Sequence, residues 1–295
     1  MKLIDTHTHA WGLDTPELPW QAEVLPPGWE GTYTHTDLVG DMDRIGIDEA
    51  VIVTTPLYGR GPRANEYTMR AVEAHPDRLW GVGLMEFFPE DPDGARIAVE
   101  RITGHPRMLG IRMHAALEYG ETPGDVDRSG DWITDERLEP VWEAAGNLGT
   151  TIFVFPKAQQ LSQIEDLAGR YPGTTIIVDH MAWPDETTAA DEGPWTGFKA
   201  LAEYDNVSVK VSSVPRSAAL QEGGDGRWPY ESMHGYLHAL LEWFGPERLM
   251  VGSDYPWMDN WASYGDCLSW LETVDILSAR DQAYLSYRTF ERVHS

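Results

Sequence analysis

The sequence has little cysteine, little positive charge and no long apolar run. Cys267 is the single cysteine among 295 residues, so the chain cannot form a disulfide within itself, and we expect a cytoplasmic protein. No stretch is apolar over the length that a transmembrane helix needs. The chain also reaches Asp5 too early for a secretory signal peptide. These absences argue against a disulfide-stapled secreted domain and against a membrane-spanning protein.

Positive charge is scarce throughout the chain. There are 22 basic and 48 acidic residues, which gives a formal net charge of −26. A negative net charge of this size repels nucleic acid and anionic membrane surfaces, so we predict neither as a partner. The acidic residues are spread along the chain and do not form a tail. This acidic surface is typical of salt-adapted, halophilic proteins and equally compatible with an acidic cytoplasmic enzyme, and composition does not choose between them.

Short apolar, β-branched runs alternate with amphipathic stretches along the whole chain. The predicted strands are 2–9, 50–55, 79–86, 108–114, 150–155, 175–180, 206–212 and 248–254. The predicted helices between them are 37–45, 63–74, 94–102, 137–148, 161–170 and 233–244. Regular alternation favours a parallel sheet, and eight units in one domain-sized chain predict a closed (β/α)₈ TIM barrel over residues 1–295. An open doubly wound sheet is the alternative, but no glycine-rich phosphate loop follows the first strand.

Four of the segments that follow strands are long. They are 10–33, 115–134, 181–195 and 213–229, and all lie at the carboxyl ends of strands, where barrel enzymes place their active sites. The first contains Trp11, Trp20 and Trp29, and the last contains Arg227 and Trp228. We expect most of these tryptophans to pack the loops down, with one or two left to line a substrate pocket.

Four ionisable side chains stand at the ends of three predicted strands. His7 and His9 close the first strand, and their i, i+2 spacing points both to one face. His180 ends the sixth strand and Asp254 ends the eighth. Taken singly, a histidine is more often a core residue and an aspartate a turn or cap residue. Together they predict one site at the barrel mouth, able to bind a metal or act jointly on a substrate.

Five motifs carry a resemblance to a known family. The chain has DTHTH at 5–9, GIR at 110–112, IIVDHMAWP at 176–184, NVSVKVSS at 206–213 and RLMVGSDYPW at 248–257. With the eight-strand pattern they resemble the amidohydrolase superfamily, in its amidohydrolase-related (amidohydrolase 2) branch near the sugar lactonases and 2-pyrone-4,6-dicarboxylate lactonase. The resemblance spans nearly the whole chain. It implies a TIM-barrel hydrolase and says little about the substrate.

The fifth strand departs from the family pattern. Metal-binding members carry a histidine at its end, whereas this strand ends in Phe155 and Pro156, which cannot bind a metal. The resemblance therefore implies at most one divalent ion, Zn²⁺ or Mn²⁺, on His7, His9 and Asp254, with His180 or His114 as a further ligand. Similar members of the lactonase branch work without a metal, so a metal-independent reaction is the alternative.

Two further basic residues fall within predicted strands. Arg112 lies on the same side of the fourth strand as His114, and a guanidinium there suits a substrate carboxylate through two parallel hydrogen bonds. Lys210 lies inside the seventh strand, where a buried lysine needs an anionic partner. A structural ion pair and a role in the site are equally compatible with this position.

The leading hypothesis is hydrolysis of a lactone, a small cyclic ester of an oxygenated or sugar acid. Asp254 is the predicted general base, and His7 and His9 either bind a metal or polarise the carbonyl. We expect His180 to orient the water or stabilise the oxyanion, and Arg112 to hold a carboxylate or hydroxyl of the small-molecule substrate. The alternatives are a metal-dependent non-oxidative decarboxylase of an unsaturated acid and a non-catalytic binding barrel. The oligomeric state cannot be predicted.

Overall fold

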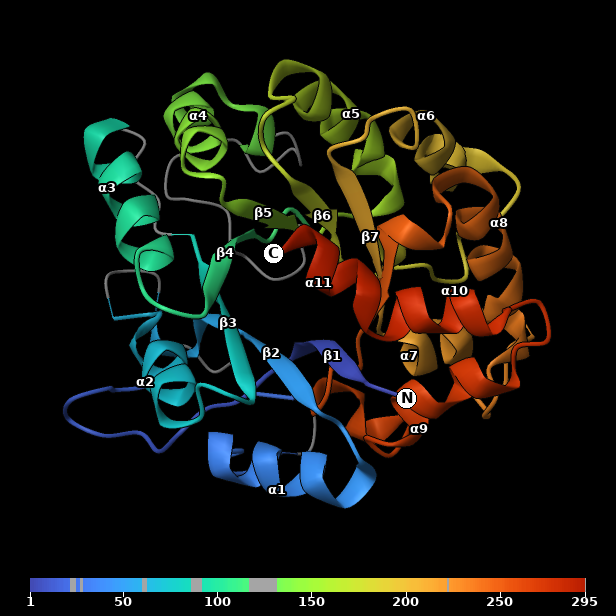
Figure 1. The fold of residues 1–295 in the computed structure, drawn as a ribbon, viewed down its shortest axis with the longest axis horizontal. Coiled ribbons are helices and arrows are strands. Elements are labelled where there is room, and N and C mark those ends of the chain that lie inside the picture. Colours follow the sequence, from blue (N-terminus) through green and yellow to red (C-terminus); the bar gives the residue numbers. More distant parts are fainter. Residues whose placement is uncertain are drawn as a thin grey trace.

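A computed structural model describes residues 1–21, 25–26, 29–59, 63–85, 92–116, 132–221 and 223–294. Eight parallel strands follow one another around a single sheet in sequence order (Figure 1). They are β1 (Ile4–Thr8), β2 (Glu49–Val53), β3 (Leu79–Leu84), β4 (Met108–Met113), β5 (Thr151–Val154), β6 (Ile176–Val178), β7 (Val207–Val211) and β8 (Leu249–Val251). Each predicted strand overlaps one of these, with β2 beginning one residue earlier than predicted, and Glu86, predicted to end the third strand, lies outside the described residues.

The sheet closes on itself where β8 meets β1. The Asp254 amide donates to the His7 carbonyl at 2.8 Å, and the His9 amide donates to the Tyr255 carbonyl at 2.9 Å. Gly252 permits this approach, because a Cβ there would lie 2.8 Å from the Cβ of His7. Closure brings the ends of the first and last strands together and confirms the predicted (β/α)₈ barrel.

Helices surround the strands. Those at the predicted positions are α1 (His35–Ile45), α2 (Glu66–Ala74), α3 (Pro92–Thr103), α4 (Glu139–Leu148), α5 (Leu161–Arg170) and α8 (His234–Phe244). The prediction missed α6 (Phe198–Leu201), α7 (Val214–Leu220), α9 (Asp266–Ser269), α10 (Ala279–Ala283) and α11 (Thr289–Val293). These five helices have four to seven residues each, too few for a 3.6-residue hydrophobic period to stand out.

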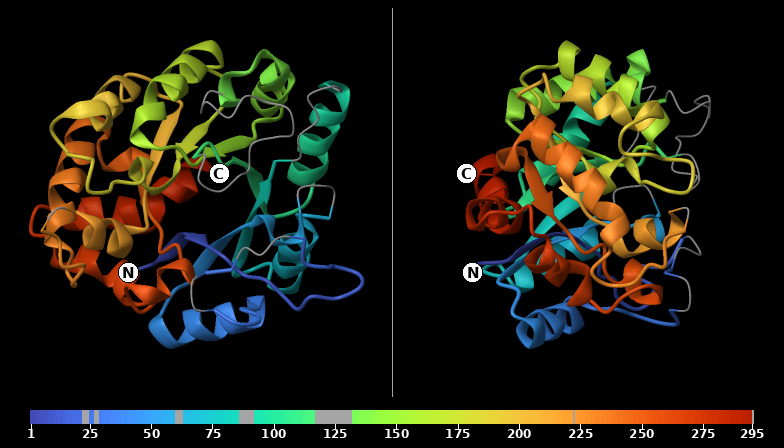
Figure 2. Two further views of the ribbon diagram at one scale, coloured as in Figure 1. Left: turned by 180° about the vertical axis from the view of Figure 1, so that it is seen from behind. Right: turned by 90° about the vertical axis from the view of Figure 1, so that its right-hand side faces the viewer.

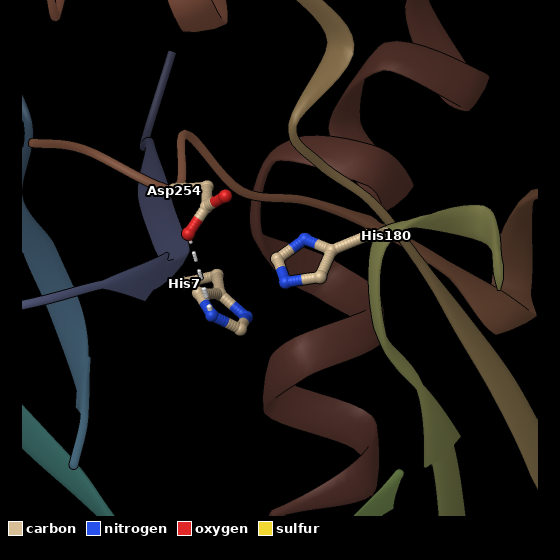
Figure 3. Close-up of side chains that lie close together, drawn as sticks. All are labelled: His7, His180 and Asp254. Carbon is tan, nitrogen blue, oxygen red and sulfur yellow. Dashed lines mark ion pairs between the residues drawn. The ribbon is translucent and has the colours of Figure 1, made fainter. Parts of the chain in front are cut away.

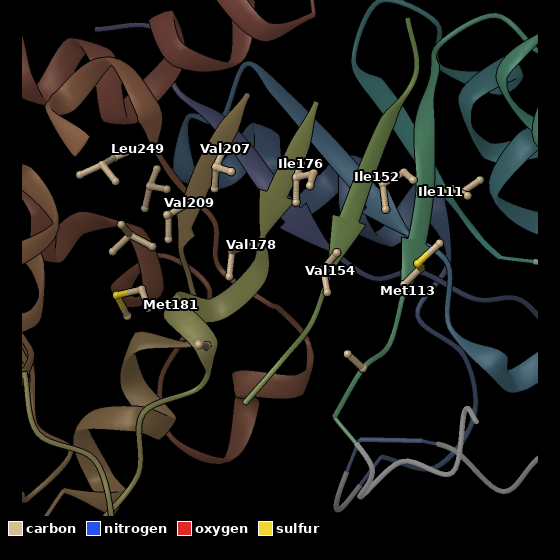
Figure 4. Packing of buried hydrophobic residues seen from close by; sticks show 14 of the residues in the cluster. Ile111, Met113, Ile152, Val154, Ile176, Val178, Met181, Val207, Val209 and Leu249 are labelled. Carbon is tan, nitrogen blue, oxygen red and sulfur yellow. The ribbon is translucent and has the colours of Figure 1, made fainter. Parts of the chain in front are cut away.

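Two hydrophobic layers fill the protein. One face of the strands packs against the outer helices, and Figure 4 shows Ile111, Ile152 and Ile176 in this layer. The other face fills the barrel interior with side chains that include Val51, Val53, Val82, Phe153, Ile177 and Met250, and Phe290 from α11 packs against them. Both termini lie on one side of the molecule (Figure 2). The helix α11 thus closes the amino-terminal end of the barrel, and the opposite end carries the site.

Among the described helices, none has the length and apolarity needed to cross a membrane. Much of the long segments at the carboxyl ends of strands is described. Residues 22–24 and 27–28 of the first, 117–131 of the second and 222 of the last lie outside the described residues.

Candidate active site

The structure brings the four predicted ionisable side chains together at the barrel mouth. His7 Nε2 lies 3.8 Å and His9 Nε2 lies 3.0 Å from Oδ1 of Asp254. The ring centroids of His7 and His180 are 4.4 Å apart. Figure 3 shows His7 of β1, His180 from the turn after β6 and Asp254 from the segment after β8 lying close together. All four side chains are buried, with at most 7% of any residue exposed.

The backbone at three neighbouring strand ends adopts a left-handed conformation. The φ angles are 55° at His180, 55° at Ser213 and 64° at Asp254. Residues with side chains rarely take this conformation, and each instance costs about 1–3 kcal/mol. Such strain persists where the surrounding structure fixes it, commonly at functional sites. Here it coincides with the three positions whose side chains meet one another.

Hydrogen bonding fixes the tautomer of His9. Its Nδ1 lies 2.7 Å from the Val53 carbonyl, which can only accept, so Nδ1 carries a hydrogen. In neutral His9 the Nε2 lone pair then faces Oδ1 of Asp254 at 3.0 Å. Two lone pairs this close repel each other unless a proton or a metal cation lies between them. The contact therefore suits either a shared proton or a cation at the mouth.

A buried ionic network lies beneath the histidines. Arg112 Nε donates to Oδ2 of Asp179 at 3.2 Å, and Lys210 Nζ lies 3.2 Å from Oδ1 of the same carboxylate. His7 Nδ1 lies 3.4 Å from Lys210 Nζ and 3.5 Å from Asp179 Oδ1. Burial opposes ionisation of Asp179, but the charges of Lys210 and Arg112 outweigh it and hold its pKa below the ordinary value. Lys210 thus has the anionic partner that its burial requires.

The sequence did not lead us to predict Asp179 as a site residue, although it directly precedes His180 in the chain. The signal was available: a buried lysine inside a strand calls for a carboxylate, and Asp179 ends a neighbouring strand. Arg112 reaches the mouth as predicted, but its Nε is engaged by Asp179 and one terminal nitrogen lies 3.4 Å from His180 Nε2.

The protonation states of the buried site groups follow from their surroundings. Burial, followed by the nearby positive charges of Lys210 and Arg112, lowers the pKa of His7 well below its usual value. Burial likewise lowers the pKa of His180. Burial opposes ionisation of Asp254, yet contacts with the two histidines His180 and His9 and with Ser213 bring its pKa below the ordinary value. The site at neutral pH combines neutral imidazoles at His7 and His180 with an ionised carboxylate.

A cavity of about 220 Å³ opens beside these groups. Its wall is partly ionisable and partly aromatic, formed by His9, Thr55, Pro56, Arg112, His114, Phe155, His180, Trp183, Arg216, Asp254, Trp257, Met258 and Trp261. The Arg216 guanidinium stacks 3.8 Å above the Trp183 ring. The cavity thus offers a carboxylate base, two guanidinium groups and flat apolar walls around a space for a small molecule.

The tryptophans named in the sequence analysis do not line this cavity. The Trp11 and Trp29 rings pack 5.8 Å apart against each other, and Trp20 Nε1 donates to the Gly12 carbonyl. Trp228 is 47% exposed. The aromatic wall comes instead from Trp183, Trp257 and Trp261. Arg216 was also missed, because it lies on the short helix α7 inside a segment predicted as a loop.

The donor set fits one divalent metal ion. Ligand atoms of His7, His180 and Asp254 lie within 4.8 Å of one another. Nε2 of His7 is buried and has no hydrogen-bond partner among the described residues, as expected of a nitrogen meant for a ligand. The strand-five position is filled by Phe155, whose ring lies 4.7 Å from His180 and stacks 4.5 Å from His114. No donor set for a second ion is found among the described residues.

Comparisons with known proteins show the family of the chain. The family model described as amidohydrolase matches residues 4–285. The chain is 26% identical to an L-fucono-1,5-lactonase of Burkholderia ambifaria, covering 91% of this chain and 86% of that protein. It is 28% identical to a 2-pyrone-4,6-dicarboxylate hydrolase of Comamonas testosteroni, covering 86% and 76%. A crystal structure of a Burkholderia multivorans amidohydrolase with bound zinc superimposes with a TM-score of 0.77 at 20% identity, over 100% of this chain and 99% of that one. The chain therefore belongs to the amidohydrolase family.

Proposed function

We propose that this protein hydrolyses a lactone, with Asp254 as the general base. The observation that carries the proposal is an ionised carboxylate at the barrel mouth, 3.0 Å from His9 and lining a cavity suited to a small ring. Two relatives similar along most of the chain are named as hydrolases of cyclic esters, a sugar lactone and a pyrone. Ester hydrolysis needs a base for water and positive charge for the developing oxyanion, and the cavity holds both.

The proposed reaction adds one water across the ring ester. Asp254 takes a proton from water as the water oxygen bonds to the carbonyl carbon and the carbonyl π pair moves to oxygen. The tetrahedral intermediate collapses, the ring C–O bond breaks, and the leaving alkoxide receives the proton held by Asp254. The product is a hydroxy acid, which ionises and releases a proton to solvent.

Positive charge for the carbonyl oxygen comes from the protein's own groups. The Arg112 guanidinium supplies it, and so does His9 when a proton lies between its Nε2 and Asp254. We assign His180 to orienting the water, which would replace Arg112, 3.4 Å away, as the hydrogen-bond donor to the single lone pair of Nε2. A divalent ion, Zn²⁺ or Mn²⁺, held by His7, His180 and Asp254 with His9 adjacent, would supply a Lewis acid and an activated water.

The substrate is proposed to carry a carboxylate or similar anionic group. Arg216 lines the cavity with its guanidinium stacked on Trp183, a geometry that presents a flat fork of donors to an anion. Arg112 lines the cavity too, but its contacts with Asp179 and His180 also give it a structural role. The aromatic wall favours a flat ring beside it.

The decarboxylase and binding-barrel alternatives rank lower. A decarboxylase of this branch relies on the full metal set, and Phe155 fills the strand-five position. A barrel that only binds a ligand does not need the ionised carboxylate of Asp254, whose strained backbone costs folding free energy.

A pH-indicator assay on a panel of lactones tests the proposal. Hydrolysis releases acid, decarboxylation consumes a proton and binding does neither. Asp254→Asn should abolish acid release while the protein melts like wild type, since general bases contribute about 10²–10⁴-fold. Activity above about a tenth of wild type would exclude Asp254 as the base.

A further inference from the structure

Two adjacent serines contact His180, but only one of them also contacts Asp254. Ser212 and Ser213 follow β7, and each hydroxyl oxygen lies 2.9 Å from Nδ1 of His180. Ser213 alone makes a further hydrogen bond, to Oδ2 of Asp254. Both serines are completely buried. Ser213 therefore touches the proposed base and its neighbouring histidine at once, without reaching the cavity.

The directions of these hydrogen bonds can be worked out. A carboxylate only accepts, so the single hydroxyl proton of Ser213 points to Asp254. Toward His180 the serine oxygen must then accept, so Nδ1 of His180 carries a hydrogen. The opposite edge of the ring agrees, because the Arg112 terminal nitrogen at 3.4 Å from Nε2 can only donate. A chain of donors thus runs from Arg112 through His180 and Ser213 to Asp254.

We propose that Ser213 is a positioning residue that holds Asp254 for catalysis. Its hydroxyl occupies Oδ2, which leaves Oδ1 as the oxygen that meets His9 and takes the proton from water. The same hydroxyl accepts from Nδ1 of His180 and so links the base to the histidine, a link that Ser212 does not make. The inference rests on the proposed lactone hydrolysis for its kinetic part. The hydrogen-bond chain itself exists without substrate.

The left-handed backbone of Ser213 supports the assignment. Its φ of 55° is unusual for serine and places the hydroxyl between the side chains of His180 and Asp254, which are themselves left-handed residues. Ser212, one position earlier, contacts the same histidine nitrogen. The two serines consequently form a matched pair that differs in the contact with Asp254.

The kinetic test compares Ser213→Ala with Ser212→Ala on a lactone that wild type hydrolyses. We expect kcat to fall about tenfold or more in Ser213→Ala with KM within about threefold, because substrate contacts are intact and the base is misaligned. Ser212→Ala should stay within about threefold of wild type, because Ser213 still accepts from Nδ1 of His180 and still contacts Asp254. Equal losses in the two alanine variants, or a loss confined to KM, would overturn the proposal.

A measurement without substrate separates this proposal from the proposed function. In protein labelled with ¹⁵N-histidine, the Nδ1–H proton of His180 is identified by its loss in His180→Gln. Hydrogen bonds in a chain polarise one another, so Ser213→Ala and Asp254→Asn should both move this resonance upfield, and Ser212→Ala should move it less. A resonance that responds to Ser212→Ala alone would disprove the chain. If no lactone is hydrolysed while the resonances behave as expected, the proposed function fails and the hydrogen-bond chain stands.

Discussion

Asp179 and Lys210 form an ion pair 3.2 Å long inside the barrel, with both residues completely buried. Asp179 also accepts from Arg112, so one carboxylate stands between two cations directly beneath His7 and His180. Burial disfavours every charge in this network, and only mutual pairing makes it tolerable. The network therefore supports the histidines from below and makes their placement depend on all three charges.

Lys210→Met should destabilise the fold, because it leaves Asp179 with one cation where it had two. Removing one partner of a buried pair costs about 3–5 kcal/mol, and the remaining Arg112 contact places this variant near the lower value. Urea unfolding followed by tryptophan fluorescence measures the change. Asp179→Asn takes the shared carboxylate away from both Lys210 and Arg112, so it should destabilise the fold more than Lys210→Met does. An Asp179→Asn variant at least as stable as Lys210→Met would show that these ion pairs are not the source of the cost.

Arg216→Met and Arg112→Met should have different kinetic signatures. Arg216 lines the cavity and stacks on Trp183, so its loss should raise KM about tenfold or more for a carboxylate-bearing lactone with kcat little changed. Arg112 also holds Asp179 and His180, so its loss should lower kcat as well as raise KM, and lower the melting temperature. A neutral lactone is the control, because its KM should respond weakly to Arg216→Met. An equal rise in KM for charged and neutral lactones would show that Arg216 does not recognise the anionic group of the substrate.

Part of the loss of folding stability at acid pH should come from His294, at the amino-terminal end of the barrel. Burial, reinforced by the charge of Lys210, lowers the pKa of His294 to about 3, and the ring packs 4.7 Å from Phe290. In the unfolded chain this histidine takes up a proton near pH 6.5, whereas the folded state excludes it. Stability from this group is therefore complete above pH 6.5 and declines by about 1.4 kcal/mol per pH unit as pH falls toward 3. The difference in free energy of unfolding between pH 7 and 5 should be smaller in His294→Gln than in wild type, with His7 and His180 contributing the remainder, and an unchanged difference would contradict this origin.

Much of the fold was predictable, because strand–helix alternation is a local pattern and eight repeats leave few architectures. His7, His9, His180 and Asp254 were predictable for the same reason: the carboxyl ends of barrel strands share one mouth. Their convergence required no knowledge of the loops. The position of Phe155 in place of a ligand could also be inferred, since it ends a predicted strand.

The supporting residues could not be predicted, because their roles depend on backbone geometry or on contacts distant in sequence. Ser213 matters through a left-handed φ that nothing in the serine-rich motif indicates. Arg216 lies on a seven-residue helix hidden in a loop, and Trp257 reaches the cavity after the last strand. Trp11 and Trp29 looked equally suited to a pocket wall, yet they pack on each other. Residue type alone does not separate these cases.

Metal content should not exceed one ion per chain, held weakly. His7, His180 and Asp254 supply three ligands, the number in a catalytic zinc site, and a second ion lacks donors because Phe155 stands at strand five. The buried charges of Asp179 and Asp254 are already balanced by those of Arg112 and Lys210. An added divalent ion leaves two positive charges uncompensated in a buried site, which weakens its binding.

The metal content per chain is measured by elemental analysis of protein purified without chelator. Activity and melting temperature are then measured before and after EDTA treatment. We expect at most one zinc or manganese per chain and activity that survives chelation in part or whole. His7→Gln and His180→Gln should reduce bound metal, whereas His114→Gln, outside the ligand trio, should not. Two tightly bound ions per chain would contradict the prediction that Phe155, at the end of strand five, leaves no donor set for a second ion. Complete loss of activity on chelation with full recovery on zinc or manganese add-back would make His7 and His180 catalytic ligands, and the shared-proton state of His9 and Asp254 would then not be the active one.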